Sequence, residues 1–301
     1  PAEFRERALP QSRIPPSRPP VLRAALFVAP HGFRVSEQSA QDNRYMRLGD
    51  RVDLERAHAQ HQALAAKLLE LGVPVVIFRG REGEDDGVFP NNVFATIPRR
   101  LIVGSMLHPV RRREAEREDI RSLFGETFGY ETRDLSASGG IAELTGALVL
   151  DRPRGIGFCG MTQRVDDLGC RAMHDAFDLE LTFRFDLADG EYHTNLVLAI
   201  LAGRVSILHP GSFRDPEAAR AIADFYSDGA LVLDDDEKAA FAGNAIAVTE
   251  RDVLFSNTSL RALRRSSRDL LEKRGFRVHG VTIDELEKGG GSLRCLIAEI
   301  F

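Results

Sequence analysis

The chain has 301 residues, a net charge of −5 at pH 7, and 43% hydrophobic and 28% charged residues, which is ordinary globular composition. A chain of this length can bury a sizeable core, and its apolar runs are far shorter than the roughly 18 residues that a membrane span needs. The acidic balance removes the basic field on which nucleic-acid binding depends. Composition therefore excludes a disordered chain, a fibre, a coiled coil and a membrane-spanning protein, and argues against a nucleic-acid partner.

The cysteines and the N-terminal segment give expectations about compartment and domain organisation. The chain has three cysteines, Cys159, Cys170 and Cys295. A small, odd number of cysteines does not form a disulfide framework, which indicates a reducing compartment. No signal-peptide pattern is visible, so we expect a cytoplasmic protein. Residues 1–20 hold six of the 14 prolines and four arginines. This composition predicts a flexible Pro/Arg-rich tail over 1–20 and a single domain over 21–301.

Hydrophobic periodicity and turn residues predict alternating strands and helices along the rest of the chain. Strands are predicted at 22–29, 73–78, 93–95, 101–103, 144–150, 156–158, 180–185, 194–201, 205–208, 231–233, 245–248, 253–255, 276–283 and 296–301. Helices are predicted at 53–71, 112–124, 163–177, 216–226 and 260–273. Asp215 and Pro216 give the fourth of these helices an N-cap and a proline at its first position.

The predicted elements recur with a regular period. The first strands of successive strand–strand–helix–strand units centre near residues 94, 147, 197, 246 and 298, a spacing of about fifty. This period indicates a repeat architecture whose last strand must return to close the fold. A doubly wound α/β sheet also alternates strands and helices, and the pattern alone does not separate the two.

The most informative local feature is the segment Lys288-Gly-Gly-Gly-Ser-Leu-Arg-Cys295. Three consecutive glycines each disfavour regular structure by roughly 0.5–1 kcal/mol relative to alanine, so we expect them where the backbone approaches a ligand or takes a positive φ. Cys295 follows this loop beside Arg294, whose charge favours a thiolate. Cys295 is therefore a candidate nucleophile, although a buried structural cysteine after a flexible loop would give the same pattern.

A cysteine nucleophile needs a base and a group that orients the base. His193, in a Tyr-His-Thr-Asn block, opens an apolar strand, where its side chain can face a pocket. Glu143 follows a glycine pair and precedes a strand, and its carboxylate can orient an imidazole or exchange protons. Asn92 belongs to a Phe-Pro-Asn-Asn block whose amides suit a neutral polar substrate. Ordinary strand caps and turns would account for each residue taken alone.

Three further patterns carry weaker hypotheses. Residues 155–160 match the dinucleotide-binding pattern G-x-G-x-x-G, but 156–158 are predicted to be the return strand of a hairpin. His58 and His61 lie three residues apart on one helix, and no third metal ligand is indicated. The acidic run 234–237 is typical of a helix start. We predict no metal site, and a nucleotide-binding α/β protein built on residues 155–160 remains an alternative.

Four ordered blocks of the sequence together resemble the amidinotransferase, or pentein, superfamily, and most closely its citrulline-utilisation hydrolase branch. The blocks are Phe-Pro-Asn-Asn at 89–92, Ala-Glu-Leu-Thr-Gly-Ala-Leu-Val-Leu-Asp-Arg at 142–152, Tyr-His-Thr-Asn at 192–195 and Gly-Gly-Gly-Ser-Leu-Arg-Cys at 289–295. The resemblance covers residues 21–301 and implies a pseudo-fivefold α/β propeller of ββαβ-type repeats. This architecture agrees with the period of about fifty and decides between the two candidate folds.

The resemblance also implies roles for the candidate residues. Cys295 is expected to be the nucleophile, His193 its acid–base partner and Glu143 the carboxylate that works with them. Asn92 and Asn195 are expected to bind the planar group of the substrate. Among arginines that could bind a substrate carboxylate, Arg44, Arg164 and Arg294 are suggested by charge alone.

The sequence departs from its relatives at positions that affect substrate choice. The position that matches an acid of the arginine deiminases is Ile97, and Asn195 replaces the acid two residues after the histidine. An amide does not replace a carboxylate as the partner of a guanidinium cation, but it can hydrogen-bond a neutral ureido group. We therefore expect a citrulline-like substrate in preference to arginine.

Taken together, the residues predict a cysteine-dependent hydrolase that acts on the ureido or guanidino carbon of a citrulline- or arginine-like small molecule through a covalent thiol adduct. No cofactor is expected. An amidinotransferase with an amine acceptor remains an alternative, because exclusion of water cannot be read from a sequence. A non-catalytic pentein binding protein is a second alternative, against which the presence of all three catalytic candidates argues. A homo-oligomer is compatible with the sequence.

Overall fold

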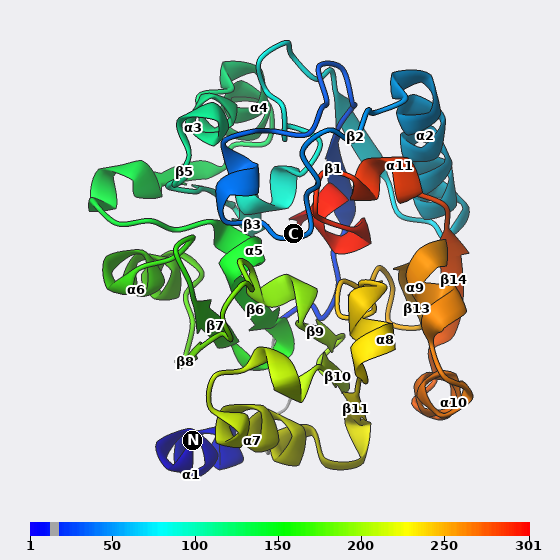
Figure 1. Cartoon of the computed structure of the whole chain (residues 1–301). Coiled ribbons are helices and arrows are strands. Elements are labelled where there is room, and N and C mark those ends of the chain that lie inside the picture. Colours follow the sequence, from blue (N-terminus) through cyan, green and yellow to red (C-terminus); the bar gives the residue numbers. More distant parts are fainter. Residues whose placement is uncertain (13–17) are drawn as a thin grey trace.

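The computed structural model describes residues 1–12 and 18–301, and Figure 1 shows its strands and helices. The strands are β1 (Ala24–Val28), β2 (Val75–Phe78), β3 (Phe94–Ile97), β4 (Arg100–Val103), β5 (Glu131–Asp134), β6 (Leu148–Asp151), β7 (Ile156–Met161), β8 (Leu181–Asp186), β9 (Leu198–Leu201), β10 (Val205–Leu208), β11 (Ala230–Val232), β12 (Ile246–Ala247), β13 (Asp252–Ser256), β14 (Arg277–Val281) and β15 (Ala298–Ile300). The helices are α1 (Ala2–Ser12), α2 (Leu54–Glu70), α3 (Pro109–Ala115), α4 (Glu118–Ser122), α5 (Leu144–Ala147), α6 (Asp167–Ala176), α7 (Pro216–Tyr226), α8 (Asp235–Ala239), α9 (Asn257–Ala262), α10 (Arg265–Lys273) and α11 (Asp284–Glu287).

The strands form five three-stranded sheets that repeat one pattern: β15-β1-β2, β3-β4-β5, β6-β7-β8, β9-β10-β11 and β12-β13-β14. In each sheet the first and second strands are antiparallel and the second and third are parallel. A parallel pair needs a crossover, and helices supply it between the second and third strands. The predicted strand–strand–helix–strand repeat is confirmed, and the alternative of one doubly wound sheet is wrong. Closure into a propeller stays a prediction.

The first sheet joins the two ends of the chain. Strand β15 pairs antiparallel with β1, with Ile300 opposite Ala24, and the amide of Arg23 donates to the carbonyl of Ile300 at 2.8 Å. The expected return of the last strand is therefore observed. The sequence did not predict β5, because its residues Glu-Thr-Arg-Asp are polar and mostly exposed and give no apolar signal.

The N-terminal segment is helical where a flexible tail was expected. Helix α1 packs against α7, and its Phe4 is buried. The Phe4 ring stacks on Phe183 with centroids 4.3 Å apart, and Arg5 donates to Asp224 at 3.0 Å. Proline content dominated the prediction, whereas residues 2–8 contain good helix formers and one large apolar anchor. Residues 13–17 of the expected tail lie outside the described part of the chain.

The dinucleotide hypothesis for residues 155–160 is also corrected. Gly157 and Gly160 lie within strand β7, and Gly155 occupies the left-handed turn before it. A phosphate-binding loop must instead connect a strand to the N-terminus of a helix.

Within the described residues, no helix is both long and apolar enough to cross a membrane.

Short helical turns precede four of the five first strands. These turns are η2 (Pro90–Asn92) before β3, α5 before β6, η6 (Thr194–Leu196) before β9 and η9 (Leu293–Leu296) before β15. The sequence predicted starts at 144, 194 and 296 for β6, β9 and β15, whereas these strands begin at Leu148, Leu198 and Ala298. Turn η2 contacts α5 and η9, and α5 contacts η6. The repeat therefore brings four separate sequence blocks together at the starts of the first strands.

The docking of α1 gives a stability prediction. Phe4→Ala should lower the free energy of unfolding by about 3 kcal/mol, because it removes a buried aromatic side chain and leaves a cavity beside Phe183. Urea denaturation measures this change. Glu3→Ala on the exposed side of the same helix is the matched control and should change stability by less than about 0.5 kcal/mol. Equal stability of the Phe4 variant and the native chain would mean that α1 is not docked in solution.

Candidate active site

A buried carboxylate and a buried imidazole form the centre of the site. Glu143 precedes α5 and His193 precedes η6, and both side chains are fully buried. His193 Nε2 lies 2.9 Å from Glu143 Oε2, and the backbone N–H of Leu107 donates to Glu143 Oε1 at 3.2 Å. Because a carboxylate only accepts, Nε2 carries the hydrogen and Nδ1 keeps its lone pair.

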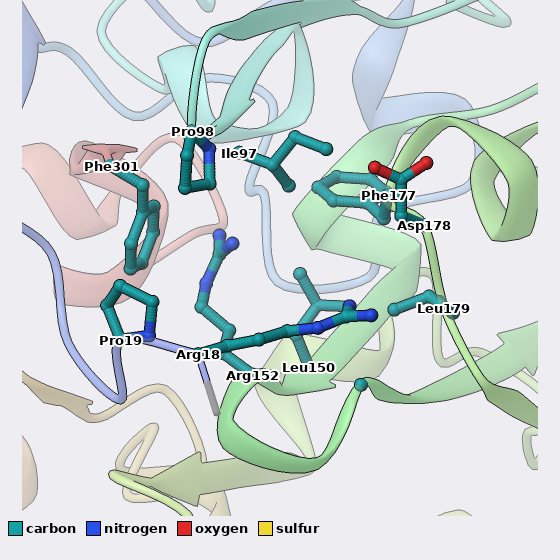
Figure 2. A pocket seen from close by; sticks show the side chains of 11 residues that line it. Arg18, Pro19, Ile97, Pro98, Leu150, Arg152, Phe177, Asp178, Leu179 and Phe301 are labelled. Carbon is teal, nitrogen blue, oxygen red and sulfur yellow. The ribbon is translucent and has the colours of Figure 1, made fainter. Parts of the chain in front are cut away.

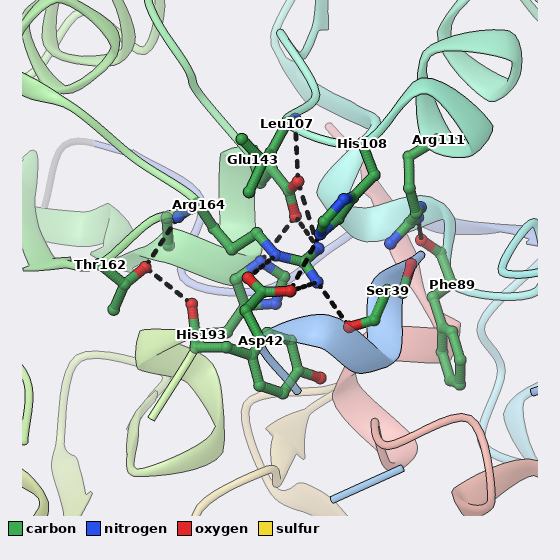
Figure 3. Close-up of polar contacts among 12 residues, drawn as sticks. Ser39, Asp42, Phe89, Leu107, His108, Arg111, Glu143, Thr162, Arg164 and His193 are labelled. Carbon is green, nitrogen blue, oxygen red and sulfur yellow. Dashed lines mark hydrogen bonds and ion pairs between the residues drawn. The ribbon is translucent and has the colours of Figure 1, made fainter. Parts of the chain in front are cut away.

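Arg164 also binds the Glu143 carboxylate, as Figure 3 shows. Its guanidinium donates to Glu143 Oε2 at 3.1 Å and to both oxygens of Asp42, at 2.5 and 2.8 Å. His108 Nε2 lies 2.9 Å from the same Asp42 carboxylate. One buried cation therefore joins a residue of the irregular segment 29–53 to the residue that orients His193.

The charges of this cluster set the protonation states. Burial opposes ionisation of Glu143, but the Arg164 cation and the hydrogen bond from His193 outweigh it and hold the Glu143 pKa well below its usual range. Burial lowers the pKa of His193, although Glu143 acts in the opposite direction. The imidazole is therefore neutral at neutral pH, as a general base must be.

Cys295 lies in turn η9 and is buried, with a side-chain exposure of 1%. Two amide groups surround its sulfur: Asn244 Nδ2 is 3.3 Å and Asn195 Nδ2 is 3.5 Å from Sγ. Burial raises the pKa of the Cys295 thiol, and these N–H groups lower it. The expected positive φ of the preceding glycine run is present at Gly290.

A small cavity of about 260 Å³, including its open mouth, lies against Cys295. Its wall includes Asp86, Asn92, Arg111, Arg164 and Tyr192 together with Ser39, Asn43 and Met46 of segment 29–53. The wall therefore combines the nucleophile candidate with one carboxylate, two guanidinium groups and amides.

Three buried atoms lack a hydrogen-bond partner within the described residues: Asp86 Oδ1 and Asn92 Oδ1, which belong to the cavity wall, and His193 Nδ1, whose residue is not part of that wall. A Cβ atom on Gly146 would lie 2.5 Å from Asn92 Oδ1 and 2.8 Å from His193 Nδ1, so only glycine fits between them. Each of the three can accept a hydrogen bond, and leaving such atoms buried without a donor is costly. The cavity is thus suited to a ligand that carries several N–H groups.

Two residues lie elsewhere than the sequence suggested. The Arg294 guanidinium donates to the Ile297 carbonyl and to Glu299, each at 2.8 Å, and Arg294 is not part of the cavity wall. We therefore assign it a structural role in place of substrate binding. Ile97 lines a different, largely apolar pocket beside Arg152 and Phe301, which Figure 2 shows.

Several site residues were not predicted as such. Asp86 belongs to an acidic run just before the 89–92 block, and Arg111 lies in α3. The Arg111 guanidinium donates to both oxygens of Glu114 and to the carbonyl of Phe89. Their position near a recognised block was a usable signal, but burial of such charges is not visible in one sequence.

Within the described residues, no group of three or more His, Cys, Asp or Glu side chains is placed to hold a metal ion.

The family model described as N,N dimethylarginine dimethylhydrolase, eukaryotic, matches residues 29–301, so the chain belongs to this family. Its curated relatives include protein YkgA of Bacillus subtilis, 24% identical over 82% of this chain and 80% of the relative. Protein ZK1307.1 of Caenorhabditis elegans is 25% identical over 93% of this chain and 94% of the relative. Both relatives are described as uncharacterized.

Solved structures share the fold. The N-terminal domain of ArgZ, an arginine dihydrolase from cyanobacteria solved with substrate bound, matches with a TM-score of 0.79 and 21% identity over 92% of this chain and 97% of that one. The dimethylarginine dimethylaminohydrolase of Pseudomonas aeruginosa, complexed with citrulline, matches with a TM-score of 0.72 and 18% identity over 93% and 100%. These proteins and this chain share the mixed α/β pentein fold.

The depressed pKa of Glu143 predicts how stability depends on pH. A carboxylate whose pKa is lower in the folded state stabilises the fold above its unfolded value of 4.5, and that stability is lost as pH falls. Glu143→Gln should cost about 3 kcal/mol at pH 7, because it leaves Arg164 without one partner. The variant should then lose less stability than the native chain between about pH 5 and 3.

Urea denaturation at a series of pH values measures both effects. Glu272→Gln on the exposed face of α10 is the matched control and should reproduce the native pH dependence. An unchanged slope in Glu143→Gln would contradict the ionised state assigned to Glu143.

Proposed function

We propose that this protein is a hydrolase in which Cys295 attacks the ureido or guanidino carbon of a citrulline- or arginine-like amino acid. The observation that carries the proposal is the cavity that joins Cys295 to two unpartnered acceptors, Asp86 Oδ1 and Asn92 Oδ1, together with the unpartnered His193 Nδ1 on the other side of Gly146 from Asn92 Oδ1. Ureido and guanidino groups are planar and rich in N–H donors, so they complement such acceptors.

The proposed reaction has two steps. His193 Nδ1 takes the thiol proton and the sulfur forms a bond to the central carbon; the carbon–nitrogen bond then breaks as His193 protonates the departing nitrogen. In the second step water gives a proton to His193 and its oxygen bonds to the same carbon. The carbon–sulfur bond then breaks, and the sulfur takes the proton from His193 to restore the thiol and the neutral imidazole. Glu143 orients the imidazole throughout and stabilises its cationic form.

The charged groups of the wall favour an amino acid as substrate. Asp86 lies on the same wall as Arg111 and Arg164, so the cavity presents one anion and two cations. An α-ammonium group would pair with Asp86 and an α-carboxylate with Arg111, since Arg164 is already engaged by Asp42 and Glu143. Two structures of one relative support this class: ArgZ is described as an arginine dihydrolase bound to substrate, and a variant of it as covalently bound to a reaction intermediate.

The central prediction concerns the nucleophile. On a panel of citrulline, acetylcitrulline, arginine, agmatine and dimethylarginine, Cys295→Ala should lower the release of ammonia, or of dimethylamine from dimethylarginine, on the order of 10³-fold or more, because no covalent adduct can form. Cys170→Ala, which removes another buried thiol outside the cavity, is the matched control and should keep activity. Continued turnover by Cys295→Ala would contradict the covalent route.

The same panel separates the remaining alternatives. Ammonia from a citrulline-type compound supports the neutral-substrate argument based on Asn92 and Asn195, and reaction of arginine-type compounds alone contradicts it. If no compound in the panel reacts, transfer to an amine acceptor and a non-catalytic binding role replace the hydrolase.

A second prediction tests the assignment of Asp86. Asp86→Asn should raise KM for citrulline by about 10- to 100-fold, since a charge-assisted hydrogen bond is lost. Acetylcitrulline, which has no ammonium group, should be affected much less. If arginine suffers far more than citrulline, Asp86 instead contacts the reacting group. Steady-state kinetics on the three compounds decide between these assignments.

A further inference from the structure

The repeat that begins with β12 also supplies a polar residue to the site, and the sequence did not single it out. The chain has six asparagines. Asn43 and Asn92 line the cavity, and Asn195 and Asn244 contact the sulfur of Cys295. Asn244 lies two residues before β12, as Asn92 lies two residues before β3. The residues just before β12 therefore contribute to the site, as do the residues just before the first strands of other repeats.

The amide group of Asn244 is fully engaged. Asn244 is 1% exposed, and its Oδ1 accepts from the backbone N–H groups of Arg294, at 2.9 Å, and Cys295, at 3.4 Å. Its Nδ2 donates to the Asn195 carbonyl at 2.7 Å and to Cys295 Sγ at 3.3 Å. One side chain thus holds the backbone of η9, the backbone of η6 and the reactive sulfur.

Asn195 contacts the same sulfur in a less defined way. Its Nδ2 is 3.5 Å and its Oδ1 is 3.8 Å from Sγ, so neither atom is committed to that contact. The two amides therefore differ in kind. Asn195 can turn toward a substrate, whereas the backbone contacts of Asn244 fix its Nδ2 as a donor to the sulfur.

We propose that Asn244 is a further catalytic residue, which donates a hydrogen bond to Cys295 Sγ and holds turn η9 so that the sulfur borders the cavity. This inference rests on the proposed role of Cys295 as the nucleophile. Asn244 acts twice in the reaction, because the sulfur is negatively charged before it attacks the carbon and again when it leaves the adduct.

The physical need for such a donor follows from burial. A buried sulfur is poorly solvated as an anion, and burial raises the pKa of the Cys295 thiol. A hydrogen bond donated to the charged form favours that form and is stronger than one to the neutral thiol. Because Cys295 is shielded from water, a fixed amide N–H takes the place of solvent at the sulfur.

Asn244→Asp separates this role from a purely structural one. The aspartate keeps an oxygen that can accept from the N–H groups of Arg294 and Cys295, but it replaces the N–H donor with a second oxygen. If Asn244 only holds the turn, loss of its N–H donor should not affect ionisation of the Cys295 thiol. If Asn244 donates to the thiolate, loss of the donor disfavours ionisation, and the added negative charge disfavours it further.

The experiment is the pH dependence of iodoacetamide alkylation at Cys295 in the full chain, followed by mass spectrometry. In Asn244→Asp the midpoint should rise by about one pH unit or more, so alkylation at neutral pH should slow about 10-fold. kcat should fall, with a smaller change in KM. Asn257→Asp, the same substitution at an exposed helix start, is the matched control and should behave as the native chain does. A folded Asn244→Asp variant with the native midpoint would overturn the proposal.

A measurement on the native chain covers the case in which Asn244→Asp does not fold. With asparagine labelled by ¹⁵N, only six side-chain amide signals are present. The assigned Asn244 Nδ2 signal should titrate with the midpoint found by alkylation, and should stay constant in Cys295→Ala. A signal that does not move as the thiol ionises would overturn the proposal. If Cys295→Ala keeps full turnover, the proposed function fails, whatever the alkylation profiles show.

Discussion

The site depends on the ion pairs that the buried guanidinium of Arg164 makes with Asp42 and Glu143. Arg164 is 1% exposed and binds Asp42 and Glu143 at once, so it fixes both the irregular segment 29–53 and the start of α5. Ser39 of that segment accepts from Arg164 through its carbonyl at 3.2 Å. The wall of the cavity and the orientation of the His193 imidazole therefore share one anchor. Without it, the carboxylates of Asp42 and Glu143 would both lose the cation that they share.

Such a cluster is hard to explain as a source of stability. Removing charges from water is expensive, and buried ion pairs often contribute little net free energy of folding. What the cluster achieves is a set of protonation states: Glu143 remains ionised and His193 remains neutral, with Nδ1 free. The same charges that cost solvation make the imidazole a base, so the arrangement is better understood as preparation for chemistry.

The sequence was most informative where a residue type has only one physical use. The period of about fifty predicted five repeats because each repeat must bury one sheet, and Gly290 has the positive φ that its place in a glycine run suggested. Recognised blocks located Cys295, His193, Glu143 and Asn92, and the structure brings all four side chains near one another. The chemical roles that we propose for them rest on that proximity.

The failures have separate physical reasons. Apolar residues of the turns α5, η6 and η9 were included in the strands that follow, since a buried helical turn and a buried strand are equally apolar. The helix predicted over 260–273 is divided into α9 and α10, each with its own start, which periodicity did not show. Arg294 was chosen by charge, but charge does not tell which way a side chain points. Helix α1 was missed because proline content was weighed above its buried Phe4.

The repeat explains why the site can be assembled from short blocks far apart in the chain. Each first strand begins after a tight turn, and neighbouring turns contact one another, so each repeat can deliver a side chain to a common centre. Asn92, Glu143, His193 with Asn195, Asn244 and Cys295 come from five different units of this kind. A change in one turn therefore alters one chemical group while the sheets behind it stay in place. In such a fold the substrate is determined at the turns, and the scaffold determines only that they meet.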